Sequence, residues 1–123
     1  MNIFQRFVAY LQLREAVRKA DDAHRNDGGR YYVMPTFGTD KKPKVVVMDR
    51  YNFRKLKHKG YISTKATTRD LIGECFYFTP YRNGSGFITP EFQHRKQLQY
   101  LSWYAAELKA AKINRKRKKS ICS

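Results

Sequence analysis

The segment Lys44–Gly60, with the sequence KVVVMDRYNFRKLKHKG, combines two patterns that decide the expected fold. Its apolar run Val45–Met48 is typical of a strand that is buried on both faces. Asp49 then stands where a helix N-cap is expected, and Gly60 is the expected C′ residue of that helix. The segment therefore predicts a buried strand that leads directly into a short helix.

The short helix is expected to have one cationic and one apolar side. At helical spacing, Arg50, Arg54 and Lys57 fall within one narrow face, whereas Phe53 and Leu56 point roughly the other way. The strand would anchor the helix in the core. The sequence therefore predicts that the helix holds positive charges toward solvent, where they can meet an anionic partner.

Before this segment, the pattern predicts a long helix and a first strand. Residues 2–25 follow an amphipathic helical pattern, which Asn26–Gly29 ends. Residues 30–37 read as a strand with Pro35 near its end or on an edge. Because the loop 38–43 is short and polar, the two strands are expected to pair as an antiparallel hairpin.

After the short helix, the chain is expected to return to the sheet. Tyr61 and Ile62 are expected to pack on the core, and one short turn is expected around Asp70–Ile72. The aromatic run Glu74–Thr79 predicts a third strand, which the turn-rich loop 80–86 follows.

The last third of the chain predicts a second long helix. Thr89, Pro90 and Glu91 provide an N-cap, a proline at the first helical position and an acid in the first turn. The helix is expected to run to about Lys112, and residues 114–123 to form a flexible basic tail. The order of elements predicts an α+β domain over residues 1–113. It would have long N- and C-terminal helices, a short middle helix, and a small three-stranded antiparallel sheet with helices against one face.

The two long helices each carry more apolar residues than one core stripe needs. The expected core stripes are Ile3, Tyr10, Leu13, Val17 and Ala20 in the first helix, and Leu98, Leu101, Ala105 and Leu108 in the last. Further apolar residues lie on other sides: Phe4, Phe7, Val8 and Leu11, and Phe92, Tyr100 and Trp103. A second stripe in the first helix indicates either a partner or deeper burial of that half. The residues expected at an interface are Phe4, Phe7, Leu11, Tyr100 and Trp103.

The charge of the chain is strongly positive and unevenly distributed. The formal net charge is +16 for 123 residues. Residues 1–29 hold five Lys or Arg and four acids, so the remaining residues carry a net charge of +15. Such a balance points first to nucleic acid, and then to an anionic membrane or an acidic protein. The nearly neutral first helix is better suited to protein contact.

The expected nucleic-acid contacts are the cations of the hairpin tip, short helix and tail, together with a loop tyrosine and its neighbour. Tyr81 and, with less weight, Tyr51 are the stacking candidates, since exposed aromatic rings can stack on unpaired bases. Phe76 and Phe78 are assigned to the core instead. The full set is Lys41, Lys42, Lys44, Arg50, Arg54, Lys57, Tyr81, Arg82, Arg115, Lys116, Arg117, Lys118 and Lys119.

Catalysis, cofactors and membrane insertion find little support in the sequence. The three histidines and two cysteines show no metal-ligand spacing, and no nucleophile with a neighbouring base can be named. Cys75 and Cys122 form no disulfide framework, which favours a reducing compartment. Charged residues interrupt the N-terminal apolar stretch, so neither a signal peptide nor a membrane span is expected. We therefore expect a non-enzymatic protein without cofactor or metal, which lies inside a cell or is packed in something made inside a cell.

Three segments carry a resemblance to a known group of proteins. RYYVMP at Arg30–Pro35, VMDRYNFRKLKHKGYI at Val47–Ile62 and DLIGECFYFTPYRNGSG at Asp70–Gly86 resemble small basic proteins of tailless single-stranded-DNA phages of gut bacteria, the microviruses. The resemblance covers most of the chain and implies a phage context, in which a small basic protein would handle the genome or line a particle.

The sequence thus leads to two functional hypotheses. The first is a small nucleic-acid-binding protein, phage-encoded, that contacts phosphates rather than reading bases. The alternative is a structural or interaction protein, such as a capsid-associated or host-factor-binding module. Its partners would then include a second copy of itself or a phage structural protein.

Overall fold

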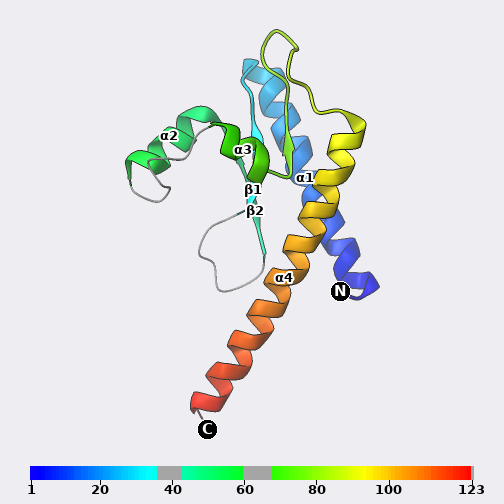
Figure 1. Ribbon diagram of the computed structural model, residues 1–123, viewed down its shortest axis with the longest axis vertical. Coiled ribbons are helices and arrows are strands. Elements are labelled where there is room, and N and C mark those ends of the chain that lie inside the picture. The colour runs from blue at the N-terminus through cyan, green and yellow to red at the C-terminus, as the bar shows by residue number, and fades with distance from the viewer. Residues whose placement is uncertain (36–42, 60–67, 123) are drawn as a thin grey trace.

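The computed structural model describes residues 1–35, 43–59 and 68–122, with Thr68 and residues 114–122 described by their backbone course only (Figure 1). These residues form long helices at both ends of the chain and a small sheet with two short helices between them. The elements are α1 (Ile3–Asp27), β1 (Tyr32–Pro35), β2 (Val45–Met48), α2 (Arg50–His58), α3 (Thr68–Glu74), β3 (Tyr77–Phe78) and α4 (Pro90–Cys122).

The expected α+β class is confirmed, including the antiparallel three-stranded sheet and its flanking helices. The strand order is β2-β1-β3, and β1 pairs with both neighbours in antiparallel register. Val33 is the centre of this register, opposite Val47 on one side and Tyr77 on the other, and its side chain is fully buried. The first strand of the hairpin is therefore the middle of the sheet.

The prediction that Val45–Met48 is buried on both faces was wrong. β2 is an edge strand, and Val46 keeps 39% of its surface exposed. A run of valines is compatible with an edge as well as with a centre, because the apolar pattern alone does not record how many strands flank it. Met48, at the end of the same strand, is buried.

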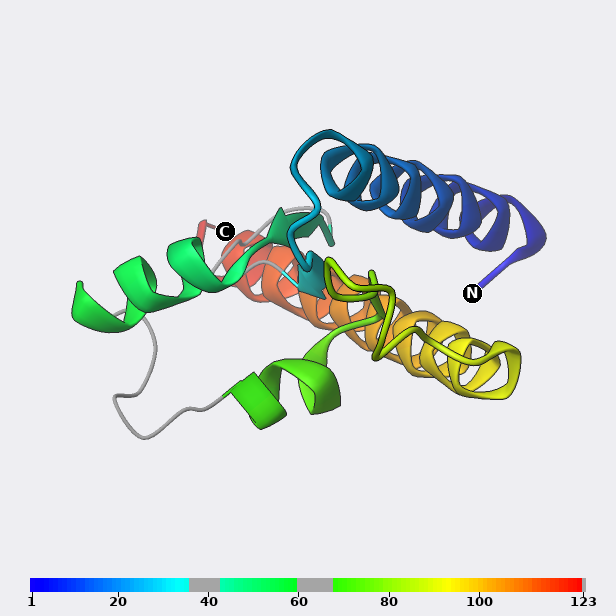
Figure 2. The ribbon, with the colours of Figure 1, turned by 90° about the horizontal axis from the view of Figure 1, so that it is seen from above.

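Helices cover both faces of the sheet, not one face as the sequence predicted. One apolar cluster joins Val33 and Phe76 to residues of α1 and α4, and a second joins Met34 and Met48 to Phe53 of α2 and to α3. The alternation of side chains along β1 sends Val33 to the first cluster and Tyr32 to the second. Figure 2 shows α1 and α2 on opposite sides of the sheet.

α1 begins and ends with capping contacts. Asn2 and Gln5 form a reciprocal capping box, in which the Asn2 Oδ1 accepts from the Gln5 N–H at 2.7 Å. At the other end, Gly28 adopts a φ of 75° and its N–H donates to the His24 carbonyl at 2.6 Å. The helix stop predicted at Asn26–Gly29 is thus confirmed.

The buried stripe of α1 is shifted from the one the sequence indicated. The stripe consists of Ala9, Leu13, Ala16 and Ala20, whereas Ile3 and Tyr10 are 88% and 55% exposed. Small alanine side chains let α1 approach the sheet and α4 closely. The largest residues of the helix therefore remain outside, and a count of large apolar residues gives the wrong face.

α4 also turns an unexpected face toward the core. Tyr100 and Tyr104 are buried, while Leu98, expected in the core stripe, is 55% exposed. The Tyr100 hydroxyl donates to the carbonyl of Ala9 at 2.7 Å, which allows this polar tip to be buried. The placement of Tyr100 at an interface was therefore wrong. Trp103 is half-buried and packs beside Tyr100, with ring centroids 6.0 Å apart.

Three boundaries differ from those predicted. α3 runs from Thr68 to Glu74, longer than a single turn, and β3 covers only Tyr77–Phe78 of the expected Glu74–Thr79. α4 continues past Lys112 to Cys122, and its C-terminal half stands clear of the other elements (Figure 1). That residues 114–123 move freely stays a prediction. Gly60, Tyr61, Ile62, Lys41 and Lys42 lie outside the described residues.

Candidate nucleic-acid interface

α2 presents Arg50 and Arg54 on its outer side, as predicted, whereas Lys57 lies closer to the buried Phe53 than predicted. The Asp49 Oδ1 accepts from the Asn52 N–H at 2.8 Å and so caps the helix. Phe53 is only 5% exposed and anchors the helix in the second cluster, whereas Arg50 and Arg54 are exposed. Lys57 is half-buried, with its Nζ 5.5 Å from the centroid of the Phe53 ring.

α2 contains four Lys or Arg and no acid, since its sequence is RYNFRKLKH. Tyr51 is 64% exposed, and the Lys55 Nζ lies 4.6 Å from the centroid of its ring. An exposed aromatic ring beside an ammonium group is a combination that can contact both base and phosphate. The sequence makes Tyr51 only a weak stacking candidate, because most tyrosines of this kind pack in a core. Its exposure in the structure is the observation that makes it a stronger candidate.

The second cationic segment is the C-terminal half of α4. After Glu107 this helix contains no acid, and Lys109 and Lys112 are exposed. The helical backbone continues through the basic run Arg115, Lys116, Arg117, Lys118 and Lys119, whose side chains are not among those described. Both views place α2 and this end of α4 on the side of the molecule away from the start of α1 (Figures 1 and 2).

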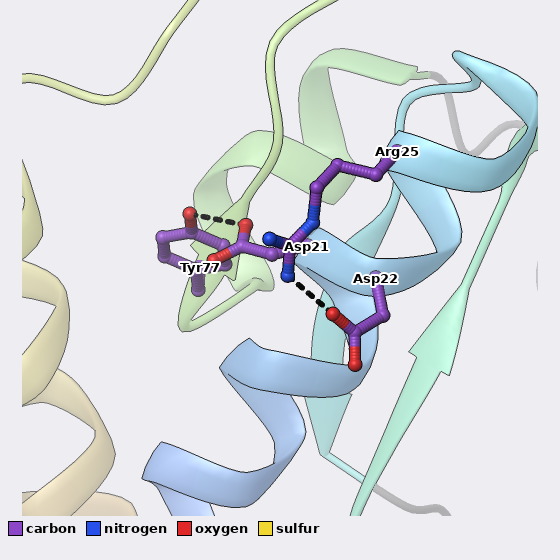
Figure 3. Close-up of polar contacts among 4 residues, drawn as sticks. All are labelled: Asp21, Asp22, Arg25 and Tyr77. Atoms are coloured by element: carbon purple, nitrogen blue, oxygen red, sulfur yellow. Dashed lines mark hydrogen bonds and ion pairs between the residues drawn. The ribbon is translucent and has the colours of Figure 1, made fainter.

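Several acids accept hydrogen bonds from neutral groups. Asp21 accepts from the Tyr77 hydroxyl at 2.7 Å (Figure 3). Asp27 accepts from the Tyr31 hydroxyl and, at 2.7 Å, from the Gly29 N–H. These bonds lower the pKa of Asp27, and the bond that the Tyr31 hydroxyl donates to Asp27 raises the pKa of Tyr31 to about 12. The carboxylates of Asp21 and Asp27 thus accept from phenols and an amide, and the charge of Arg82 also lowers the pKa of Asp27.

The two ion pairs that the described side chains show lie within α1. Arg25 pairs with Asp22 (Figure 3), and the Lys19 Nζ lies 3.8 Å from the Glu15 carboxylate. Together with the neutral partners of Asp21 and Asp27, these pairs keep negative charge on α1. In contrast, α2 contains no acid in its sequence, and neither does the part of α4 after Glu107.

Two basic residues serve the fold instead of the surface. Arg30 is 7% exposed, and its guanidinium lies 4.6 Å from the Phe78 ring centroid and 4.1 Å from that of Tyr81. Its Nη1 donates to the Gly86 carbonyl at 2.9 Å. Arg30 therefore holds the loop 80–86 against the sheet. Sequence reasoning did not single it out, because its contacts come from residues about fifty positions away.

Lys96 is the second buried cation, with 4% exposure. Its Nζ donates to the carbonyls of Ile72 and Gly73 at 2.5 and 3.0 Å, at the C-terminal end of α3. A cation at this end interacts favourably with the helix dipole. Burial lowers the pKa of Lys96.

The loop candidates Tyr81 and Arg82 are partly engaged within the chain. One face of the Tyr81 ring is covered by Arg30, and the ring keeps 40% of its surface exposed. An Arg82 Nη donates to the Asp27 carbonyl at 2.6 Å, which ties the loop to the end of α1. Lys44 is exposed at the start of β2. The structure thus does not gather all predicted contacts into one patch.

The interface residues predicted in α1 are exposed. Phe4, Phe7 and Leu11 keep 74%, 58% and 43% of their surface exposed, on the side of the helix opposite its buried stripe. The alternative, in which this half of α1 is simply buried more deeply, is wrong for the described chain. These residues form an apolar surface separate from the cationic ones.

Among the residues that the structure describes, no cluster of three or more His, Cys, Asp or Glu could hold a metal ion. In the same part of the chain, no helix has the length and apolar character to cross a membrane. No protein-family model matches the chain, and searches among curated proteins and solved structures find no match. The resemblance to microvirus proteins therefore stays untested.

Proposed function

We propose that the protein binds nucleic acid non-specifically, with α2 and the C-terminal half of α4 contacting phosphates. The observation that carries the proposal is the segregation of charge: α2 has four cations without an acid, while acids of α1 are held by tyrosines, amides and neighbouring cations. The exposed guanidinium groups of Arg50 and Arg54 would release counterions when they bind a polyphosphate, which favours association.

Phosphate contact is favoured over base readout by how the cations are arranged. Arg50 and Arg54 are exposed on a short helix that projects from the body, and the basic end of α4 projects separately (Figure 1). Two projecting basic segments are suited to the phosphate backbone of a nucleic acid, which carries regularly spaced negative charges. Figure 1 shows the two helices pointing in different directions, whereas sequence readout usually relies on one element that enters a groove.

The experiment measures the affinity of the chain for mixed-sequence oligonucleotides as a function of salt. We expect a steep fall between about 50 and 200 mM salt, with little preference for sequence. The Arg50→Gln/Arg54→Gln variant should bind all sequences more weakly and reduce the salt slope by about 1–2, since each lost phosphate contact removes roughly 0.7–0.9.

The matched control is Arg14→Gln/Arg18→Gln, which removes the same charge from two exposed positions of α1. Its affinity should fall less than that of the α2 variant. Equal losses from the two variants would mean that net charge alone drives binding and that α2 has no special place in it. An affinity that hardly changes with salt would overturn the proposal.

Removing residues 114–123 provides a separate test of the second segment. The truncation deletes five cations and none of the described core residues. The fold should persist, and the affinity and salt slope should fall without binding being lost. Complete loss of binding would assign the function to the end of α4 alone.

The alternative hypothesis, a structural or interaction protein in a phage particle, is favoured by a different observation. The exposed apolar surface of α1 has no role in phosphate binding. The two hypotheses use different elements, so they can hold together. Purification with bound nucleic acid that a high-salt wash removes would favour the first. If the chain purifies free of nucleic acid and binds none, the first hypothesis is excluded and only the structural or interaction hypothesis remains.

A further inference from the structure

The outward side of α1 carries large apolar residues over its first three turns. Ile3, Phe4 and Phe7 are 88%, 74% and 58% exposed, and Tyr10 and Leu11 are 55% and 43% exposed. Their spacing of three, four and seven positions places them on one side of the helix, opposite the buried stripe that includes Ala9 and Leu13. We call these five residues the α1 apolar patch.

The exposed area of the patch is of the size that a small interface needs. With roughly 150–200 Å² for each large apolar side chain, the exposed fractions correspond to about 500–600 Å² per chain. Two such patches facing each other would bury about 1,000–1,200 Å², the lower end of specific protein interfaces. A patch of about this size is at the upper end of the largest apolar patches on monomers, and such patches are often functional.

Charge indicates which partner can approach this patch. The chain carries +16, so two copies repel each other over most of their surface. Residues 1–13, which contain the patch, hold one cation, Arg6, and no acid, and the four acids of residues 1–29 begin at Glu15. α1 is therefore the element through which a second copy can approach with the least repulsion.

The position of the patch also favours a second copy of the chain as its partner. α1 packs on one face of the sheet through Ala9 and Leu13, whereas α2 packs on the other through Phe53. The C-terminal end of α4 points away from the start of α1 (Figure 1). Two copies that meet through α1 would keep their strongly cationic segments on the outside, apart from each other.

From these observations we propose that the chain forms a two-fold symmetric dimer through an antiparallel pair of α1 helices centred near Phe7. Around such an axis, Phe7 of one copy meets Phe7 of the other, and Phe4 of each meets Leu11 of the other. Arg14 and Arg18 of each copy then extend beyond the N-terminal end of the other helix. A parallel pair would instead place like charges side by side along both helices.

The test is sedimentation of nucleic-acid-free protein over a range of concentrations, at raised salt to screen the remaining repulsion. The mass should rise from 14.6 kDa toward twice that value. The Phe4→Ser/Phe7→Ser variant should stay monomeric, with a dimer dissociation constant raised at least about 100-fold. Its helical content, measured by circular dichroism, should match that of the parent.

Tyr51→Ser is the matched control, because Tyr51 is an aromatic residue of α2 with 64% exposure. This variant should dimerise like the parent. If it lost the dimer as well, association would not be specific to α1. A parent chain that is monomeric at every concentration would overturn the proposal. A monomer that instead binds anionic vesicles, and loses this binding in the Phe4→Ser/Phe7→Ser variant, would assign the patch to a membrane surface.

Cysteine cross-linking tests the geometry of the pair. In a Cys122→Ser background, Phe7→Cys should form disulfide-linked dimers under mild oxidation, since the two-fold axis brings this position close to its copy. Arg18→Cys lies on the same outward side of α1, three turns further along, and should not. Cross-linking at position 18 but not at position 7 would overturn the antiparallel arrangement.

Discussion

α1 and α2 are both anchored by one buried side, yet their outer sides are opposite in character. The outer side of α1 begins with apolar residues and continues with charges of both signs. The outer side of α2 carries Arg50, Arg54 and Lys55 and no acid. In α1, Asp21 and Asp22 are engaged by Tyr77 and Arg25. The difference shows that the net charge of +16 is not spread evenly over the helices. Under the proposed function, binding would depend on the helix that carries cations without acids.

The largest expected effect tests what the two helices share. Leu13→Ala in α1 and Phe53→Ala in α2 each remove a buried side chain with 6% or 5% exposure. We expect losses of unfolding free energy of about 2–5 kcal/mol for Leu13→Ala and about 3–5 kcal/mol for Phe53→Ala. Urea denaturation followed by circular dichroism measures both. A loss below about 1 kcal/mol for Phe53→Ala would mean that α2 is not anchored as described.

The next effect concerns the inner side of α1. Tyr100→Phe deletes the hydroxyl that donates to the Ala9 carbonyl at 2.7 Å, and should cost about 1–2 kcal/mol of unfolding free energy. Tyr10→Phe is the control, because this tyrosine of α1 is 55% exposed. The control should cost less than about 0.5 kcal/mol. Equal costs in the same denaturation experiment would show that the Tyr100 hydroxyl does not hold α1 to α4.

Removing the cap of α2 should separate stability from binding. Asp49→Ala loses the hydrogen bond to the Asn52 N–H at 2.8 Å and should cost about 1 kcal/mol of unfolding free energy. The same change removes an acid beside the cations of α2, so the folded variant should bind an oligonucleotide at least as tightly as the parent. Weaker binding by the folded variant would indicate that Asp49 orients the cations as well as capping the helix.

The smallest expected effect appears at alkaline pH and depends on Asp27 of α1. The hydrogen bond to Asp27 raises the pKa of Tyr31 from 10.0 to about 12. Because the pKa is higher in the folded chain, this bond stabilises the fold below pH 10 and the contribution is lost as the pH rises from 10 to about 12. Tyr31→Phe should be slightly less stable than the parent at pH 8, and the difference should shrink between pH 10 and 12. A difference that stays constant over this range would exclude the linkage.

Much of the fold could be predicted because local signals mark the ends of its elements. Asp49 and Thr89 are recognisable caps, and Gly28 is a recognisable stop. The prediction failed where distant parts of the chain decide burial. The sequence around Val46 does not show that β2 pairs only with β1 among the described strands. The sequence around Tyr100 does not show that its hydroxyl donates a hydrogen bond to the carbonyl of Ala9.

The candidate sites divide in the same way. Arg50, Arg54 and the apolar residues Phe4 and Phe7 could be found from helical spacing, because each set lies within one helix. The burial of Arg30 could not be predicted in this way, because its guanidinium contacts Tyr81 and Gly86 of a loop that is distant in the sequence. Charge counting alone therefore overestimates the cations available at the surface.

The contact between Tyr100 and Ala9 joins positions that are 91 residues apart, which has a consequence for synthesis on the ribosome. The β1–β2 hairpin can cover part of α1 early, but the hydrogen bond between Tyr100 and Ala9 cannot form until α4 has emerged. The first turns of α1 therefore remain without this contact until most of the chain has been translated. A nascent chain released before residue 100 should remain sensitive to protease within α1.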